Sequence, residues 1–238
     1  MNRHLLPSLA LVLAGALALA ASSSQPVVAA GENLASAKAT AQVGDIGLVS
    51  GPLTSGASEG EWTTVMSSRL KTSNMKDLFV DVSLETSLFT ETNVKSKGGT
   101  RDTSTSQGQI EVQVLVDGQP AHPGVVVFDR RVQTLTAVFQ GILTDSIILD
   151  PTTGLITIDL DTVEPEEVGL LLDTMQAGSF NFIAQDVSSG IHTIEVQARI
   201  DLGVTVQAGD AVAKAAVGKG SVTVEEIRLI KDAEIVID

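Results

Sequence analysis

The feature that most constrains the fold of this chain is an alternation of apolar and largely polar residues. It runs through LFVDVSLETSL (residues 78–88) and again through IEVQVLVDG (residues 110–118). Side chains alternate between the two faces of a strand, so this period of two predicts strands with one buried face. The apolar positions are Leu78, Val80, Val82 and Leu84 in the first segment and Ile110, Val112, Val114 and Val116 in the second.

Further segments extend the pattern. Residues 124–139 read as one long strand with a bend at Asp129 to Arg131, and residues 146–160 read as two strands joined by a turn at 150–154. Proline fixes one angle of such a turn and glycine supplies the positive one. Residues 92–109 are polar and contain glycine, so we expect a mobile loop there. The segment 218–220 (Gly-Lys-Gly) predicts a hairpin turn before a last long strand.

The fold class predicted from these segments is all-β. Roughly eight to ten short strands at fairly even spacing are typical of an antiparallel β-sandwich or a jelly-roll-like fold. We expect one short helix around residues 165–177, where Pro165 suits a first helical position and Gly178 suits a C-terminal cap. Between them, apolar residues recur at helical spacing, namely Val168, Leu171, Leu172 and Met175.

The N-terminal residues predict export. Residues 1–30 have a positive start, an apolar stretch and small residues that fit a cleaved signal peptide, with cleavage after Ala20, Ala21 or Ala30. The apolar run is shorter than a bilayer span requires. We therefore expect a secreted or periplasmic protein without a membrane span in the mature chain. Residues 31–60, rich in Gly, Ala and Ser, predict a flexible N-terminal arm, and residues 61–238 a single β-sandwich domain.

Composition and net charge argue against several classes of binding partner. The formal net charge is −14 and the sequence contains no cysteine. A polyanion is repelled by phosphate backbones, so nucleic-acid binding is not expected. Disulfides are impossible, although a chain of this length can bury a core without them. The aromatic side chains on which sugar-binding surfaces and protein hot spots depend are scarce, with one Trp and no Tyr.

His192 is the residue that decides between an enzyme and a structural protein. It begins an apolar row that continues through Ile194 and Val196, just past a turn at residues 188–190. A catalytic base needs a nucleophile and an orienting partner beside it, and the sequence contains no G-x-S-x-G motif. We expect the imidazole to bond a backbone group where the strand enters the sheet.

Other candidate sites are weaker still. His122 and His192 are too few for a histidine-rich zinc site. Calcium could be held by Asp159 with Asp161, or by Asp145 with Asp150, but surface acids are the favoured interpretation. The run Gly218-Lys219-Gly220-Ser221 departs from the phosphate-binding loop pattern. No catalytic, cofactor-binding or metal-binding residue is therefore assigned, and no cofactor is expected.

Paired acids occur at residues 166–167 and 225–226. A glycosidase needs two acids that face each other across a cleft, which spacing alone does not show. The second pair lies where the apolar row changes phase, and a β-bulge at that point would restore both faces.

These observations favour an exported, non-catalytic β-sandwich with a structural or adhesive role at or outside the cell envelope. The alternatives are a secreted ligand- or polysaccharide-binding module and a secreted hydrolase built from scattered carboxylates. Self-assembly into a homo-oligomer through terminal strands is a further hypothesis, since the arm and the segment AEIVID (residues 233–238) are both β-prone. We favour instead that these segments add edge strands to their own domain or stay flexible.

Overall fold

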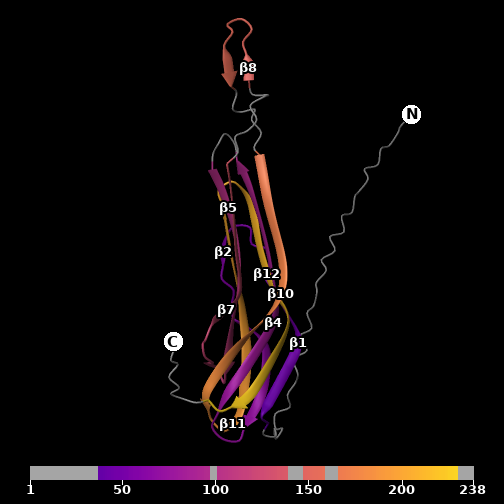
Figure 1. Cartoon of the computed structure of the whole chain (residues 1–238), viewed down its shortest axis with the longest axis vertical. Helices are drawn as coiled ribbons and strands as arrows, with labels where there is room; N and C mark the ends of the chain where they lie inside the picture. The colour runs from indigo at the N-terminus through magenta and orange to yellow at the C-terminus, as the bar shows by residue number, and fades with distance from the viewer. Residues whose placement is uncertain (1–36, 97–100, 139–146, 159–165, 230–238) are drawn as a thin grey trace, which may run out of the picture. The chain divides into compact units, whose positions relative to one another are not determined.

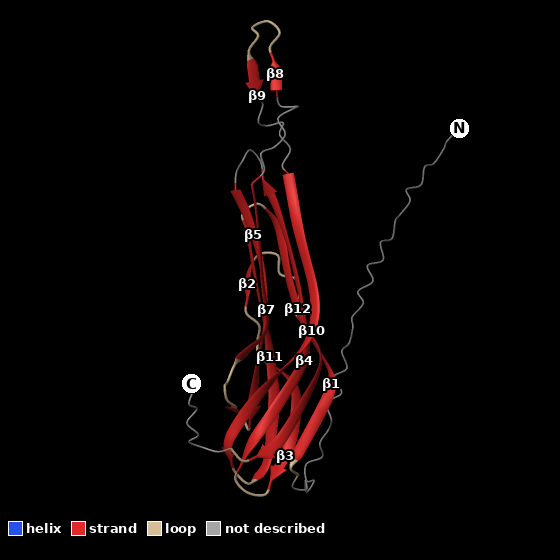
Figure 2. Cartoon of the chain, viewed as in Figure 1, coloured by secondary structure: helices blue, strands red, loops and turns tan. Residues whose placement is uncertain are grey.

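The structure is a computed structural model that describes residues 37–96, 101–138, 147–158 and 166–229. Figure 1 labels strands along the chain, and Figure 2 shows strands and loops but no helix within these residues. The strands are β1 (Ala39–Val49), β2 (Gly56–Ser58), β3 (Thr63–Thr72), β4 (Lys76–Ser96), β5 (Arg101–Val116), β6 (Gln119–Pro120), β7 (Val126–Val138), β8 (Ile147–Leu149), β9 (Ile156–Ile158), β10 (Glu166–Val187), β11 (Gly190–Val206) and β12 (Gly209–Ile227).

Two antiparallel sheets pack face to face. The first has the order β1-β12-β4-β10, and the second has the order β2-β11-β5-β6, with β3 also paired to β11 and β7 also paired to β5. Their inner faces form one hydrophobic core, because side chains at every second position of β4, β5, β11 and β12 point between the sheets. The predicted antiparallel β-sandwich is confirmed.

The predicted helix at residues 165–177 is wrong. Residues 166–187 form β10, which pairs with β4 along its length from Glu166 opposite Ser96 to Val187 opposite Lys76. Helix propensity is a weak preference, and continuous pairing with a neighbouring strand overrides it here. The apolar residues Leu171 and Leu172, whose spacing resembled a helical stripe, lie on opposite faces of an edge strand and remain partly exposed.

Two predicted connections are also strand. β4 runs to Ser96 and β5 begins at Arg101, so the expected loop at 92–109 is strand except for residues 97–100, which lie outside the described residues. Gly218 and Gly220 do not form a hairpin turn. They lie inside β12, where the register with β4 shifts between Val217 and Gly220. The bulge expected at Glu225 and Glu226 is absent from the register of β12, which runs evenly there.

Other local predictions are confirmed. β8 and β9 pair across the turn at 150–154, in which Gly154 has a φ of +68° and Asp150 accepts a hydrogen bond of 2.8 Å from the Thr152 N–H. β7 is one strand with a register shift opposite Ile110 and Glu111, next to the predicted bend. The hairpin between β10 and β11 turns at residues 188 and 189.

The N-terminal arm is only partly as expected. The described residues from 37 onward are ordered into strands, with β1 paired to β12 and β2 paired to β11. The flexible arm predicted for 31–60 is therefore wrong at these strands, and the favoured alternative of an edge strand added to its own domain holds for β1. The predicted signal peptide (1–30) and the C-terminal segment 230–238 lie outside the described residues.

The core changes composition along the strands. We call the part between Leu78–Leu84 of β4 and Ile110–Val116 of β5 the aliphatic half, since nearly all its inner side chains are Leu, Ile or Val. In the part between 86–94 of β4 and 104–108 of β5, which we call the hydroxyl half, Thr and Ser share the inner positions with Leu88, Val94 and Gly108. Its buried polar members are Thr86, Thr90, Thr92, Ser104, Ser106 and Gln133.

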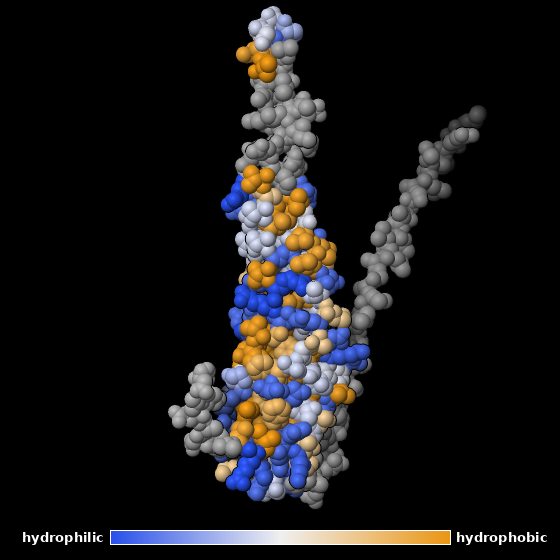
Figure 3. All heavy atoms as spheres, viewed as in Figure 1, coloured by the Kyte–Doolittle hydropathy of each residue, from blue (hydrophilic) through white to orange (hydrophobic). Residues whose placement is uncertain are grey.

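The surface mixes both residue types. On the face drawn in Figure 3, separate hydrophobic patches lie among hydrophilic ones. Large apolar side chains that are at least 40% exposed occur on β10 in particular, including Leu171 and Met175.

Candidate functional site

The sequence singled out His192, and the structure places it at the start of β11 with only 4% of its surface exposed. Its partners come from three other segments. Asp117 ends the β5 strand in a tight turn with Gly118, Thr72 ends β3, and Ser188 lies in the β10–β11 turn. The predicted contact with a backbone group is confirmed, because Nε2 lies 2.9 Å from the carbonyl oxygen of Ser188.

The distances resemble those of a nucleophile, base and acid. His192 Nδ1 lies 2.7 Å from Asp117 Oδ2, and His192 Nε2 lies 3.2 Å from the Thr72 hydroxyl. In a hydrolytic triad the same order of groups lets the imidazole take a proton from the hydroxyl. Whether the imidazole of His192 can take this proton depends on where the Thr72 hydroxyl points.

The hydrogen bonds oppose such a proton transfer. The Thr72 hydroxyl donates to the Ser188 carbonyl oxygen at 2.6 Å, and a carbonyl oxygen is only an acceptor. The hydroxyl proton is therefore directed at Ser188 rather than at Nε2, which lies 2.9 Å from the same carbonyl oxygen. Thr72 is itself buried, with 2% of its surface exposed.

Asp117 is held as a carboxylate by the same contacts. Desolvation raises its pKa, but the hydrogen bond with His192, the hydrogen bond from the Thr193 N–H and the charge of His192 outweigh it, so the pKa lies below its ordinary value. Asp117 Oδ1 accepts from Thr193 N at 2.8 Å while Oδ2 holds the imidazole. One carboxylate thus joins the β5 turn to two successive residues of β11.

Two histidines, His122 and His192, lie close in space, which the sequence did not predict. His122 and His192 line one hollow of about 260 Å³, together with Asp117. The backbone of His122 pairs with Ile183 of β10 through hydrogen bonds of 2.8 and 2.9 Å. His122 therefore ties the second sheet to the edge of the first.

A second polar cluster lies on the outer face of the second sheet around Arg199 of β11. Its guanidinium bonds Glu111 of β5 at 2.7 Å and Glu59 at 2.8 Å, and it lies 5.1 Å from the ring centre of Trp62, the single tryptophan of the chain. The hydrogen bond with Glu111 raises the pKa of Arg199, and the charges of Asp201, Glu111 and Glu59 add to it despite desolvation. One face of the Trp62 ring is therefore already occupied by a cation.

The remaining sequence candidates do not form a described site. Glu225 and Glu226 are neighbours in β12 and point to opposite faces, and Glu167 pairs with Lys95 at 3.3 Å. Asp150 binds its own turn, and hydrogen bonds from Thr153 and Thr152 lower its pKa. Asp145, Asp159 and Asp161 lie outside the described residues.

Neither a metal-binding cluster nor a membrane-spanning helix occurs among the described residues. Among residues 37–96, 101–138, 147–158 and 166–229, no three His, Cys, Asp or Glu side chains lie close enough to hold a metal ion. Over those same ranges, no helix has the length and apolar character needed to cross a membrane.

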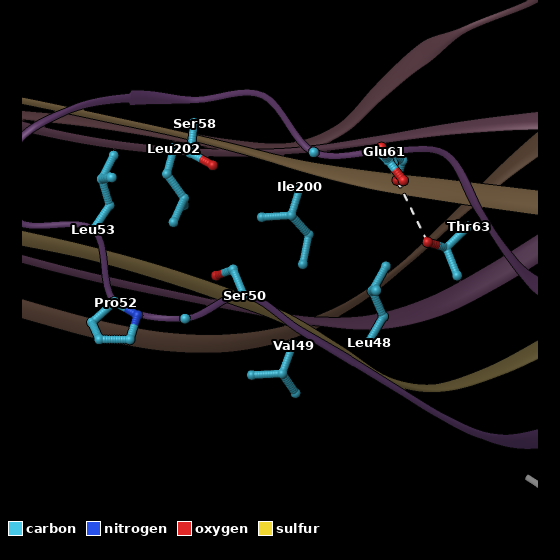
Figure 4. Close-up of a pocket in the computed structure, with 12 residues that line it drawn as sticks. Leu48, Val49, Ser50, Pro52, Leu53, Ser58, Glu61, Thr63, Ile200 and Leu202 are labelled. Carbon is cyan, nitrogen blue, oxygen red and sulfur yellow. Dashed lines mark hydrogen bonds between the residues drawn. The ribbon is translucent and has the colours of Figure 1, made fainter. Parts of the chain in front are cut away.

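A further feature is a groove between the edges of the two sheets. It has a volume of about 410 Å³. One side is formed by residues 48–53, which run beside β12, and the other by residues 58–63, which run beside β11. Figure 4 shows Leu48 and Leu53 on one side and Ile200 and Leu202 on the other, with their side chains directed into the space between. Sequence reasoning missed this groove because it depends on where two distant segments diverge.

Comparisons with known proteins give no assignment. No protein-family description and no curated protein match the chain. Among solved structures, the Gx strain of infectious bursal disease virus matches with 8% identity and a TM-score of 0.15, over 83% of this chain and 46% of that one. The VP2 subviral particle of the same virus matches with 10% identity and a TM-score of 0.15, over 81% of this chain and 42% of that one. The chain thus spans less than half the length of these proteins, and likeness at this level supports no conclusion on function.

Proposed function

We propose that this chain is exported through a cleaved signal and serves as a non-catalytic β-sandwich with a structural or adhesive role at or outside the cell envelope. The observation that carries the proposal is the use of the polar clusters. Each polar cluster joins strands that are distant in the sequence, and its hydrogen-bond donors and acceptors bind groups on neighbouring strands. His192, Arg199 and Gln133 are the three clearest cases.

The cluster around Gln133 illustrates this use. Its side chain, 5% exposed, accepts a hydrogen bond from the Thr90 hydroxyl at 2.8 Å and donates to Thr92 at 2.7 Å and to the Leu170 carbonyl at 2.6 Å. Arg131 of the same strand donates to the Leu172 carbonyl at 3.1 Å. Side chains of β7 therefore bind the backbone of β10, which protects the edge of the first sheet.

The test of export is the mass and location of the product in the source organism. We expect a protein that lacks its leader, cut after Ala20, Ala21 or Ala30, in the envelope or extracellular fraction. A variant without residues 2–20 is the control and should stay inside the cell. A full-length chain retained in the cytoplasm contradicts the proposal.

The test of a non-catalytic role is His192→Ala. The variant should unfold at a lower temperature, whereas binding or activity of the folded protein should stay within a few-fold of the parent. A loss of about a thousand-fold in turnover with the fold unchanged would indicate general acid–base or nucleophilic chemistry instead.

A further inference from the structure

The groove between the two sheets differs from the opposite side of the sandwich. On the opposite side, Arg131, Gln133 and His122 bridge from the second sheet to β10. On the groove side, the Thr40 and Ser68 hydroxyls approach to 3.2 Å near the start of β1. Further along β1 the two sheet edges diverge and leave the groove open over the core.

The walls of the groove are strand edges. Residues 50–53 continue along β12 after β1, with the Ser50 N–H bonded to the Ala215 carbonyl and Leu53 paired to Ala213. The other wall is β2, which stands at the end of the second sheet and whose three residues are exposed. Edge strands present backbone groups that can pair with an added strand. The natural occupant is thus an extended segment whose apolar side chains alternate.

The floor of the groove sets the spacing of those side chains. Ile200 and Leu202 are two residues apart on β11 and are 8% and 5% exposed. Apolar residues two apart on an added strand would lie above them with the same spacing, about 7 Å. The C-terminal segment (residues 230–238) has that pattern, with Ala233, Ile235 and Ile237 alternating with Glu234, Val236 and Asp238.

We propose that the C-terminal segment of a second copy of this chain inserts as a strand into the groove, so that Ile235 and Ile237 cover Ile200 and Leu202. This inference rests on the proposed structural role and names its partner. Repeated from copy to copy, the contact joins a groove to a different surface, so it can extend into an open chain of subunits.

The reach of the segment excludes its own groove. The Leu229 N–H bonds the Asp77 carboxylate, at the start of β4, whereas the groove lies at the level of Ala215, which pairs with Leu88. The eleven residues of β4 between these levels span about 36 Å. Ile235, six residues beyond Leu229, reaches at most about 22 Å from it. Only another copy can bring Ile235 over the groove.

Charge gives the contact a characteristic salt response. The segment carries Asp232, Glu234 and Asp238 against Lys231, the groove is lined by Glu61, and the chain has a net charge of −14. Like charges repel across the contact, and salt screens this repulsion. Assembly should therefore strengthen as ionic strength rises.

The experiment measures the mass of the purified chain, residues 31–238, by light scattering over a range of concentration and salt. The chain should form oligomers that grow with concentration, and a peptide of residues 230–238 should dissociate them. Ile235→Asp should weaken assembly by at least about tenfold, because it removes the burial of a large apolar side chain. Val236→Asp, which alters the opposite face of the segment, is its matched control and should assemble.

A second pair of variants addresses the groove. Ser58 lies opposite Leu202 and so faces the groove, whereas its neighbour Ala57 lies opposite Gly203 on the outer face. Ser58→Trp should block assembly and peptide binding, and Ala57→Trp should leave both intact. A chain that is monomeric at every concentration and salt overturns the inference, as does assembly that Ile235→Asp and Ser58→Trp do not affect. Such a failure leaves the export test untouched, so the two proposals fail separately.

Discussion

The aliphatic half and the hydroxyl half of the sandwich use the same strands but are held together by different forces. β4 crosses both, with Val80 and Val82 inward in one half and Thr90 and Thr92 inward in the other, and all four are fully buried. Burial of aliphatic side chains stabilises without regard to direction, whereas a buried hydroxyl stabilises only when it is bonded. Apolar burial therefore dominates the inner positions of the aliphatic half, whereas the bonded hydroxyls of the other half add a specific register.

Hydrogen bonds of the hydroxyl half show that register. Ser104 donates to the Asn93 carbonyl at 2.9 Å and Ser106 donates to the Val212 carbonyl at 2.7 Å, so both serines of β5 reach across to the facing sheet. A slip of either strand by one residue would turn each hydroxyl outward and leave these contacts unmade. Small side chains, with alanine at 211, 213 and 215 of β12, allow the sheets to approach closely enough for these contacts.

The largest effect is expected in the aliphatic half. Phe182→Ala should lower the free energy of unfolding by about 3–5 kcal/mol, because Phe182 is fully buried and its removal leaves a cavity. Phe180, whose ring centre lies 5.2 Å away, is 40% exposed, and Phe180→Ala is the matched control with a clearly smaller loss. Urea unfolding measures both, and equal losses would contradict the placement of this core.

Exchanging valine and threonine between the two halves tests whether their inner positions are stabilised by different forces. Val82→Thr places a hydroxyl where the aliphatic half has no polar neighbour, and we expect a loss of about 1–3 kcal/mol. Thr90→Val should also destabilise, by about 1–2 kcal/mol, since it takes from Gln133 Oε1 its hydroxyl donor. If Thr90→Val stabilised the protein in thermal unfolding, apolar burial alone would describe both halves.

The His192 cluster gives a pH-dependent prediction. The pKa of Asp117 is lowered in the folded protein, so its contribution is present above the unfolded pKa of about 4 and is lost as pH falls through the lower folded value. Asp117→Asn should therefore cost at most about 1 kcal/mol near neutral pH, since the carboxylate is half exposed. The difference between parent and variant should vanish toward about pH 2. A difference that grows on acidification would have the wrong sign.

The smallest effect is expected at the surface of the hydroxyl half. Lys95 and Glu167 pair at 3.3 Å between β4 and β10, with nearly half of each side chain exposed. Lys95→Ala should change the free energy of unfolding by less than about 0.5 kcal/mol, and added salt should remove even that. A change above about 2 kcal/mol would mean that this pair holds the edge strand in place.

The same contrast explains what the sequence could predict. The strands of the aliphatic half, at 78–84, 110–116 and 192–200, follow from alternation because their inner residues are apolar. Residues 92–109, which belong largely to the hydroxyl half, instead predict a loop, since Thr and Ser at inner positions remove the difference between the two faces. The prediction of a helix at 165–177 is wrong for a related reason. β10 is an edge strand whose two faces are both partly exposed, so its sequence shows no clear alternation.

The candidate site was predictable only in part. The position of His192 at the start of an apolar row and beside a turn was correct, and so was its backbone contact. Its partners Asp117 and Thr72 lie 75 and 120 residues away, and no local pattern links them to it. The Asp117-Gly118 pair forms a tight turn with positive φ at both residues. Such a pair is a local sign that a strand ends there in a hairpin turn.

Hydrogen exchange along β4 tests the central claim, that one sandwich contains two differently stabilised halves. The backbone amides of residues 78–84 should exchange only through global unfolding. Those of residues 86–94 should exchange at least about tenfold faster, because a difference of 1.4 kcal/mol in opening free energy corresponds to that factor. Uniform protection along β4, or slower exchange in the hydroxyl half, would contradict the account.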